Sequence, residues 1–97
     1  MKRVYLVSYD IADPKRLQRF RRRVRDYGDF LQRSVYRCSL TDEAFVRMRT
    51  RLKAVMDADE DSLLIIDLGP ATSNALARLT FIGAAPPPLR DEPDLCV

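Results

Sequence analysis

The hydrophobic pattern of the chain begins with one apolar stretch, Val4 to Ile11. Six of its eight residues are apolar or aromatic, and most of these are β-branched or aromatic, which predicts a buried strand. Asp10 stands near its end, and Asp13-Pro14 follows. An acid directly before a proline is typical of a helix N-terminus. We therefore expect Asp10 to lie where a buried strand ends and a helix is about to begin.

Two later stretches carry apolar residues at spacings of three and four, which is the pattern of a helix with one buried face. The first runs from Pro14 to about Tyr27, and Gly28 is well placed to end it in a left-handed conformation. The second follows Thr41, a favourable N-cap residue. The two predicted stripes are Leu17, Phe20, Val24 and Tyr27, and then Phe45, Met48, Leu52, Val55 and Met56.

Three further stretches favour strands. Residues 30–38 are predicted as a second strand, although their alternation gives no clean apolar face. Residues 62–68 are apolar enough for a central third strand, and residues 77–83 are predicted as a fourth. Between the second helix and the third strand, the acidic run 57–61 lacks the glycine and distal glutamate of a calcium loop. We interpret this run as a solvated turn.

This order of elements predicts an α+β fold, a ferredoxin-like β-α-β-β-α-β-type sandwich once a small edge strand is allowed. Both helices would cover one face of an antiparallel sheet. A chain of this size with a free apolar second face is expected to form a homodimer through that face. We assign residues 1–83 to this domain. We expect the proline-rich residues 84–97 to form an extended tail that docks on the partner subunit, with a frayed terminus as the alternative.

Composition narrows the function classes. Ninety-seven residues make one domain. No stretch approaches the ~18 apolar residues of a membrane span, and the start of the chain has no signal-peptide pattern, so we expect a cytoplasmic protein with no membrane partner. Histidine is absent, which excludes Ser-His-Asp or Cys-His catalysis and histidine-bearing zinc sites. Cys38 and Cys96 form no CxxC pair, and we expect buried or unused thiols.

Charge is divided unequally along the chain. Residues 1–53 contain 15 Lys and Arg against 6 Asp and Glu, whereas residues 54–97 contain 2 against 8. Arginine dominates the basic half, and its guanidinium group matches phosphate geometry. The division therefore indicates a polyanionic partner such as nucleic acid, with a solvated helix face as the alternative. The expected phosphate-binding residues are Lys15, Arg16, Arg19, Arg23 and Arg33.

Asp10 is the candidate for chemistry. A carboxylate at the end of a buried strand reaches solvent while the sheet fixes its backbone, which suits a metal ligand or a general base. The alternative is an ordinary strand-end acid that pairs with a nearby arginine.

The chain resembles the Cas-two family, the second CRISPR-associated protein and small partner of the spacer integrase. The resemblance covers roughly residues 3–83 and rests on the order and spacing of several motifs in a short chain. These are Tyr9-Asp10-Ile11, Asp13, a basic first helix that ends at Tyr27-Gly28, Leu31-Gln32-Arg33-Ser34-Val35-Tyr36, and Asp61-Ser62-Leu63-Leu64-Ile65-Ile66.

The resemblance implies a homodimer with C-terminal strand exchange, in which Asp10 of each subunit faces its twin and the pair holds a Mg²⁺ ion shared between the subunits. It implies catalytic roles for Asp10 and Tyr9, with Ser34 and Tyr36 shaping the site and the dimer. The activity would be metal-dependent endonuclease cleavage of single-stranded RNA or double-stranded DNA. The protein would serve spacer acquisition in antiviral defence, with the CRISPR integrase subunit as its partner.

The chain also departs from the family pattern. Phe30 stands where a basic residue is frequent, Tyr36 replaces the usual phenylalanine, and Ala12 replaces a common Ser or Thr. These changes preserve a scaffold role and weigh against catalysis. Three hypotheses follow: a metal-dependent nuclease of CRISPR adaptation, a non-catalytic duplex-binding bridge for the integrase, and, more remotely, a small-ligand-sensing ferredoxin-like dimer.

Overall fold

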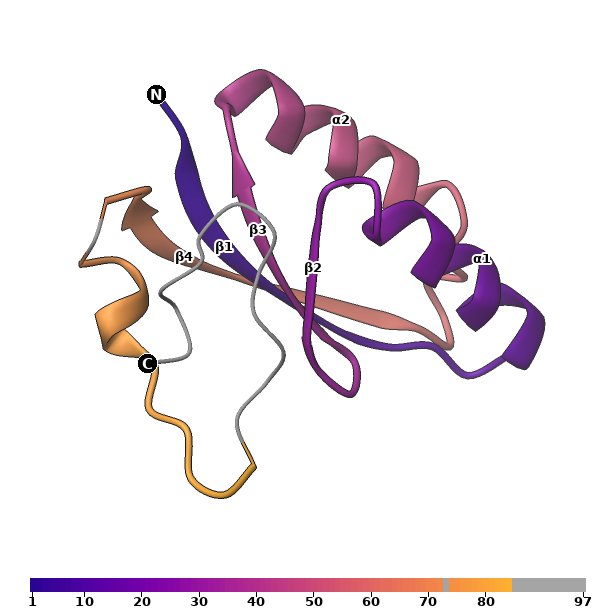
Figure 1. Cartoon of the computed structure of the whole chain (residues 1–97). Helices are drawn as coiled ribbons and strands as arrows, with labels where there is room; N and C mark the ends of the chain where they lie inside the picture. The colour runs from indigo at the N-terminus through magenta and orange to yellow at the C-terminus, as the bar shows by residue number, and fades with distance from the viewer. Residues whose placement is uncertain (73, 85–97) are drawn as a thin grey trace.

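A four-stranded antiparallel sheet carries two helices on one of its faces (Figure 1). The computed structural model describes residues 1–72 and 74–84. Its strands lie in the order β2-β3-β1-β4, which is the ferredoxin-like arrangement that the sequence predicted. The elements are β1 (Arg3–Asp10), α1 (Pro14–Val24), β2 (Gly28–Gln32), β3 (Val35–Leu40), α2 (Asp42–Lys53), β4 (Ser62–Pro70) and a short 3₁₀ helix, Leu76–Arg78.

Both helices begin where the sequence predicted. The Asp13 carboxylate accepts a hydrogen bond from the Arg16 backbone N–H at 2.9 Å, and the Thr41 hydroxyl accepts one from Ala44 N–H at 3.2 Å. These contacts satisfy backbone donors of each first turn. The end of α1 differs from the prediction, because the helix stops at Val24 and Gly28 begins β2 without a left-handed φ angle.

The predicted second strand, residues 30–38, is a hairpin of two strands. The chain reverses at Arg33 and Ser34, and Ser34 takes a φ of 62°. The turn resets the alternation of side chains, which explains why the stretch shows no single apolar face. Past the turn, β3 is buried almost throughout, and Arg37 on it pairs with Asp29 of β2 at 3.6 Å.

Two other strand predictions were wrong. In the described part of the chain β4 lies at the sheet edge rather than in its centre, and it exposes 58% of Leu64 and 42% of Ile66. Residues 77–83 form no strand, since the chain enters the short 3₁₀ helix instead. The β2–β3 hairpin supplies the fourth strand of the sheet.

The main core lies between the helices and the sheet. Residues of both predicted helical stripes pack there against alternate residues of β1 and β3, including Tyr5, Val7, Tyr9, Phe20, Val24, Tyr36, Cys38, Met48 and Leu52. Cys38 is buried, as one of the two expectations for this thiol had it, and burial raises the pKa of the thiol to about 12. Within the described residues no helix has the length and apolar character of a transmembrane span.

The other sheet face is only partly open. Val4 and Leu68 on this face are covered by Ala75 and Leu79 of the segment that follows β4, so the expectation of a wholly free face was too simple. The predicted tail contacts and Cys96 fall in residues 85–97, outside the described residues.

Candidate nucleic-acid interface

Asp10 is the last residue of the central strand β1. It lies opposite Ser62, the first residue of β4, and its side chain is exposed. Strand alternation places it on the sheet face opposite that of Tyr9. Among residues 1–72 and 74–84 its carboxylate has no hydrogen-bond or ion-pair partner. Asp10 is therefore a fixed carboxylate that remains open to an external ligand, and the alternative of an arginine-paired acid is not what the structure shows.

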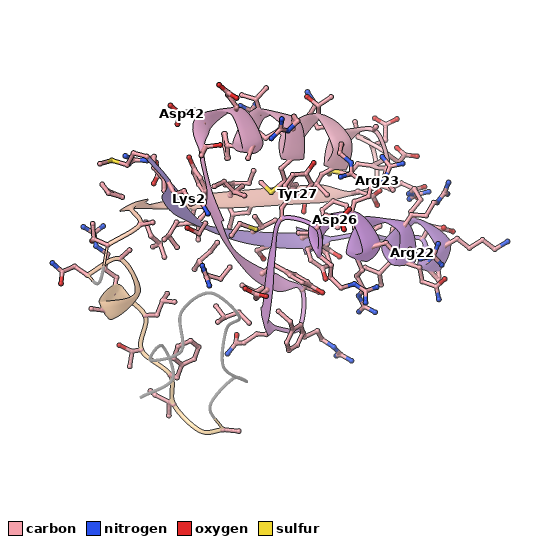
Figure 2. The ribbon with its side chains drawn as sticks, turned by 45° about the horizontal axis from the view of Figure 1, so that its top comes forward. Lys2, Arg22, Arg23, Asp26, Tyr27 and Asp42 are labelled. Atoms are coloured by element: carbon pink, nitrogen blue, oxygen red, sulfur yellow. The ribbon has the colours of Figure 1, made fainter. Side chains whose placement is uncertain are left out.

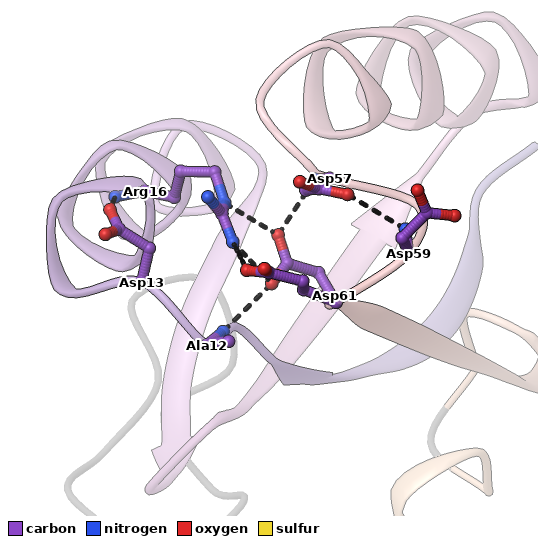
Figure 3. A network of polar contacts seen from close by, with 7 residues as sticks. Ala12, Asp13, Arg16, Asp57, Asp59 and Asp61 are labelled. Carbon is purple, nitrogen blue, oxygen red and sulfur yellow. Dashed lines mark hydrogen bonds and ion pairs between the residues drawn. The ribbon is translucent and has the colours of Figure 1, made fainter.

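A second carboxylate, that of Asp61, fixes the loop that follows Asp10 (Figure 3). Its side chain is fully buried. It accepts hydrogen bonds from the backbone N–H groups of Ala12 and Asp57, both at 2.9 Å. It also accepts bonds from Arg16 Nε at 2.9 Å and Nη2 at 3.2 Å. The interpretation of residues 57–61 as a solvated turn was therefore wrong for its last residue, which joins the β1–α1 loop to the start of β4.

The Arg16–Asp61 pair is strongly polarised. The Arg16 guanidinium, followed by the Asp57 backbone N–H, lowers the pKa of the Asp61 carboxyl to about 2 against the opposing effect of burial. In turn, the Asp61 carboxylate, followed by Glu60 at 2.9 Å from Arg16 Nη2, raises the pKa of the Arg16 guanidinium. Because the Asp61 and Glu60 carboxylates hold its guanidinium, Arg16 positions the loop, and its charge is compensated within the chain.

The other predicted phosphate-binding residues of α1 divide into two groups. Lys15 and Arg19 are exposed and make no ion pair with any described residue. Arg23 is half-buried, and its Nη1 donates to the Arg51 carbonyl at 3.0 Å, near the C-terminus of α2. Figure 2 shows Arg22 and Arg23 on α1, with Asp26 and Tyr27 just after the helix. Arg23 thus serves helix packing as well as surface charge.

Four other predicted site residues come together on the helix side of the sheet. Tyr9, Arg33, Ser34 and Tyr36 line a cavity of about 390 Å³, together with Arg21, Arg25 and Phe30. We call this cavity the arginine–aromatic groove. Tyr36 is its central ring: the centroid of Phe30 lies 5.9 Å away at an interplanar angle of 86°, and that of Tyr9 lies 6.2 Å away. Burial raises the pKa of Tyr36, and Arg25 and Arg21 oppose this effect.

One chain alone offers few metal ligands. The described residues contain no cluster of three Asp, Glu, His or Cys side chains that could hold a metal ion. Asp10 is a single exposed carboxylate, so a metal there would need ligands from a second molecule or from water.

Comparison with known proteins gives the family. The family model described as "CRISPR associated protein Cas2" matches residues 2–75 of this chain. The chain belongs to the Cas2 family. It is 40% identical to the CRISPR-associated endoribonuclease Cas2 1 of Rhodospirillum rubrum over 75% of this chain and 72% of that protein. It is 35% identical to the CRISPR-associated endoribonuclease Cas2 of Geobacter sulfurreducens over 86% of each.

A solved Cas2 structure shares the fold. The crystal structure of Streptococcus pyogenes Cas2 at pH 6.5 superposes with a TM-score of 0.70 at 32% identity, over 82% of this chain and 99% of that one. The sequence predicted the exposed position of Asp10 at a strand end, and it named Tyr9, Arg33, Ser34 and Tyr36, which the structure brings to one groove. It missed the loop-fixing role of Asp61, which it placed in a solvated turn. It also gave Phe30, Arg21 and Arg25 no role at the site.

Proposed function

We propose that this Cas2 family member acts in CRISPR adaptation as a homodimer that binds nucleic acid and cleaves it in a metal-dependent reaction centred on Asp10. The substrate would be single-stranded RNA or double-stranded DNA, and the partner would be the CRISPR integrase subunit. The observation that carries the proposal is the exposed Asp10 carboxylate, fixed at the end of the central strand without a partner among the described residues. The relatives named as endoribonucleases support it.

The exposed cations of α1 support nucleic-acid binding. Lys15 and Arg19 have no acidic partner among the described residues, so a phosphate backbone would supply the missing counter-charge. Such contacts are independent of sequence and weaken steeply as salt rises. Replacement of Arg19 by Gln should lower duplex affinity equally for unrelated sequences and reduce the salt slope by about 0.9.

The carboxylate of Asp10 suits magnesium best in a dimer. Mg²⁺ is typically held by one or two carboxylates with several waters, and a two-fold axis beside Asp10 would bring a second copy of the same carboxylate. Bound there, Mg²⁺ would lower the pKa of water and offset negative charge on the phosphodiester. The chain itself fixes the position of the Asp10 carboxylate. Strand β1 holds the Asp10 backbone, and the hydrogen bonds from Ala12 and Arg16 to Asp61 hold the next turn in place.

A non-catalytic bridge for the integrase is the second candidate. Tyr9, expected to assist catalysis, is buried on the opposite face of the sheet and packs on Phe20 with centroids 4.7 Å apart. The Ala12 backbone N–H is already bound by Asp61, and Ala12 has no hydroxyl. Among the described residues, Asp10 therefore stands without a second reactive side chain from its own loop.

The deciding experiment compares wild type, Asp10→Asn and Asp59→Asn. Asp59 is an exposed acid of the 57–61 turn, and its carboxylate makes no hydrogen bond or ion pair with a described residue. Each protein is incubated with single-stranded RNA and with duplex DNA, in Mg²⁺ and in EDTA, and duplex affinity is measured in parallel. The nuclease proposal expects cleavage only in Mg²⁺, normal in Asp59→Asn and lost in Asp10→Asn, with unchanged binding.

Two results would point elsewhere. Binding without cleavage by every variant favours the bridge, and cleavage by Asp10→Asn at the wild-type rate removes Asp10 from the reaction. Sedimentation equilibrium tests the dimer directly, and a monomer at micromolar concentration would contradict the two-carboxylate site.

A further inference from the structure

The arginine–aromatic groove lies where the β2–β3 hairpin meets α1. The Tyr9 backbone N–H donates to the Ser34 carbonyl at 3.1 Å, which fastens the hairpin turn to the end of β1. Ser34 takes its left-handed conformation at this turn. In Figure 1 the hairpin forms the outer edge of the sheet beside α1. The walls of the groove thus come from three elements, namely the central strand, the hairpin and α1.

An exposed aromatic ring stands at the mouth of the groove. Phe30 is 48% exposed, and its ring packs edge-on against buried Tyr36. Large apolar side chains exposed singly are ordinary on protein surfaces. This ring differs because three exposed arginines, Arg21, Arg25 and Arg33, line the same cavity.

The charge of the groove is uncompensated within the described chain. None of these three arginines forms an ion pair with a described acid, and the groove lining contains no Asp or Glu. Three neighbouring guanidinium groups repel one another, and an anion between them would relieve that repulsion. The cavity therefore combines an aromatic platform with an anion-binding rim.

We propose that the arginine–aromatic groove holds one unpaired nucleotide of a bound strand, with its base stacked on Phe30 and its phosphate between Arg21, Arg25 and Arg33. The inference rests on the proposed nucleic-acid binding and adds a preference for single-stranded segments. A base within a duplex is already stacked on its neighbours and cannot offer its face to Phe30, whereas an unpaired base can. A volume of about 390 Å³ lies at the small end of the ~300–1,000 Å³ range of ligand sites.

The outer cations of α1 provide the internal contrast. Lys15 and Arg19 are exposed, and neither stacks on an aromatic ring of residues 1–72 or 74–84, so they suit a duplex backbone. The groove lies one residue away from Asp10 along β1, because Tyr9 lines it. A strand with one nucleotide in the groove would be held at the same end of β1 as the Asp10 carboxylate.

The test measures affinity for a short single-stranded oligonucleotide and for a blunt duplex by fluorescence anisotropy. The variants are Phe30→Ala, Phe30→Tyr, which keeps the ring, and Arg33→Gln; Val46→Ala, another exposed apolar residue, is the matched control. Phe30→Ala should weaken single-strand binding roughly tenfold, as the loss of one stacked base predicts, and leave duplex binding unchanged. Phe30→Tyr and Val46→Ala should bind as wild type, and Arg33→Gln should weaken single-strand binding selectively.

A second readout follows stacking itself. A 2-aminopurine base in the oligonucleotide should be quenched by wild type and Phe30→Tyr and not by Phe30→Ala. If wild type binds the duplex but no single strand, the groove inference fails while the proposed function stands; if it binds neither, the proposed function fails. If Phe30→Ala loses affinity equally for single strand and duplex, Phe30 is a general nucleic-acid contact and the inference is overturned. If Phe30→Ala loses the dimer in sedimentation, Phe30 is a subunit contact and the inference is likewise overturned. Should Phe30→Ala not fold, Arg33→Gln and the wild-type quenching decide.

Discussion

The tight contact between β2 and β3 at Gly28 allows a quantitative prediction for Gly28→Ala. A Cβ atom on Gly28 would lie 2.5 Å from Cys38 Sγ, 3.0 Å from the Arg37 carbonyl carbon and closer still to the Arg37 carbonyl oxygen. Cys38 is the cross-strand partner of Gly28. The sulfur can be removed by mutation, but the carbonyl belongs to the backbone of β3, which also pairs with β1. The chain therefore has little room to yield.

Overpacking of a well-packed core costs about 1–3 kcal/mol. Because one of the obstructing groups is backbone, we expect the upper end, about 3 kcal/mol. For a domain of this size, 1 kcal/mol shifts Tm by about 4–8 °C, so Gly28→Ala should lower Tm by roughly 12–24 °C. In a Cys38→Ala background the same substitution should cost about 1 kcal/mol less.

Thermal and urea unfolding, followed by circular dichroism, measure these differences. Gly69→Ala is the matched control, since Gly69 has a φ of 96° and nothing within 4 Å of an added Cβ. It should cost about 1 kcal/mol through backbone conformation alone, and Cys38→Ala should not change that cost. A Gly28→Ala protein as stable as wild type, or a double variant with purely additive losses, would refute the steric argument.

Two further predictions concern the buried acid and the thiol. Asp61 has a lowered pKa of about 2, so its stabilising effect is fully present above about pH 4 and is lost as the pH falls through 2. The difference in Tm between wild type and Asp61→Asn should therefore shrink over that range. A constant difference would contradict the lowered pKa. Because burial raises the pKa of Cys38 to about 12, this thiol should resist Ellman's reagent at mildly alkaline pH in a Cys96→Ser variant and react once guanidinium chloride unfolds the chain. Rapid labelling of the native variant would contradict the burial.

Local patterns allowed the sequence to predict much of the fold. Three features depend on neighbours within a few residues: the N-termini of the helices at Asp13 and Thr41, the two apolar helical stripes, and the buried first strand. The hairpin could not be predicted in the same way. Its turn contains Arg33 and Ser34, without the glycine or asparagine that usually marks a left-handed turn position, and Ser34 carries the conformation nonetheless.

The site was predicted unevenly for a related reason. Asp10 could be identified because its position at a strand end follows from the pattern of its own strand. The role of Asp61 depends on Ala12 and Arg16, which are 49 and 45 residues away in sequence. An acidic run is usually solvated, and no local signal separates its one buried member from the exposed ones. Likewise, the seven lining residues of the groove come from three separate segments.

The position of β4 at the sheet edge has a consequence for how the protein behaves in solution. In the described part of the chain this strand leaves backbone donors and acceptors unpaired along one side, and it exposes Leu64 and Ile66. Such an edge is a template for further strand pairing. A partner that covers it adds stability in proportion to the logarithm of its concentration. A subunit whose β4 edge is uncovered would therefore be more prone to aggregation than one whose edge is paired with a partner.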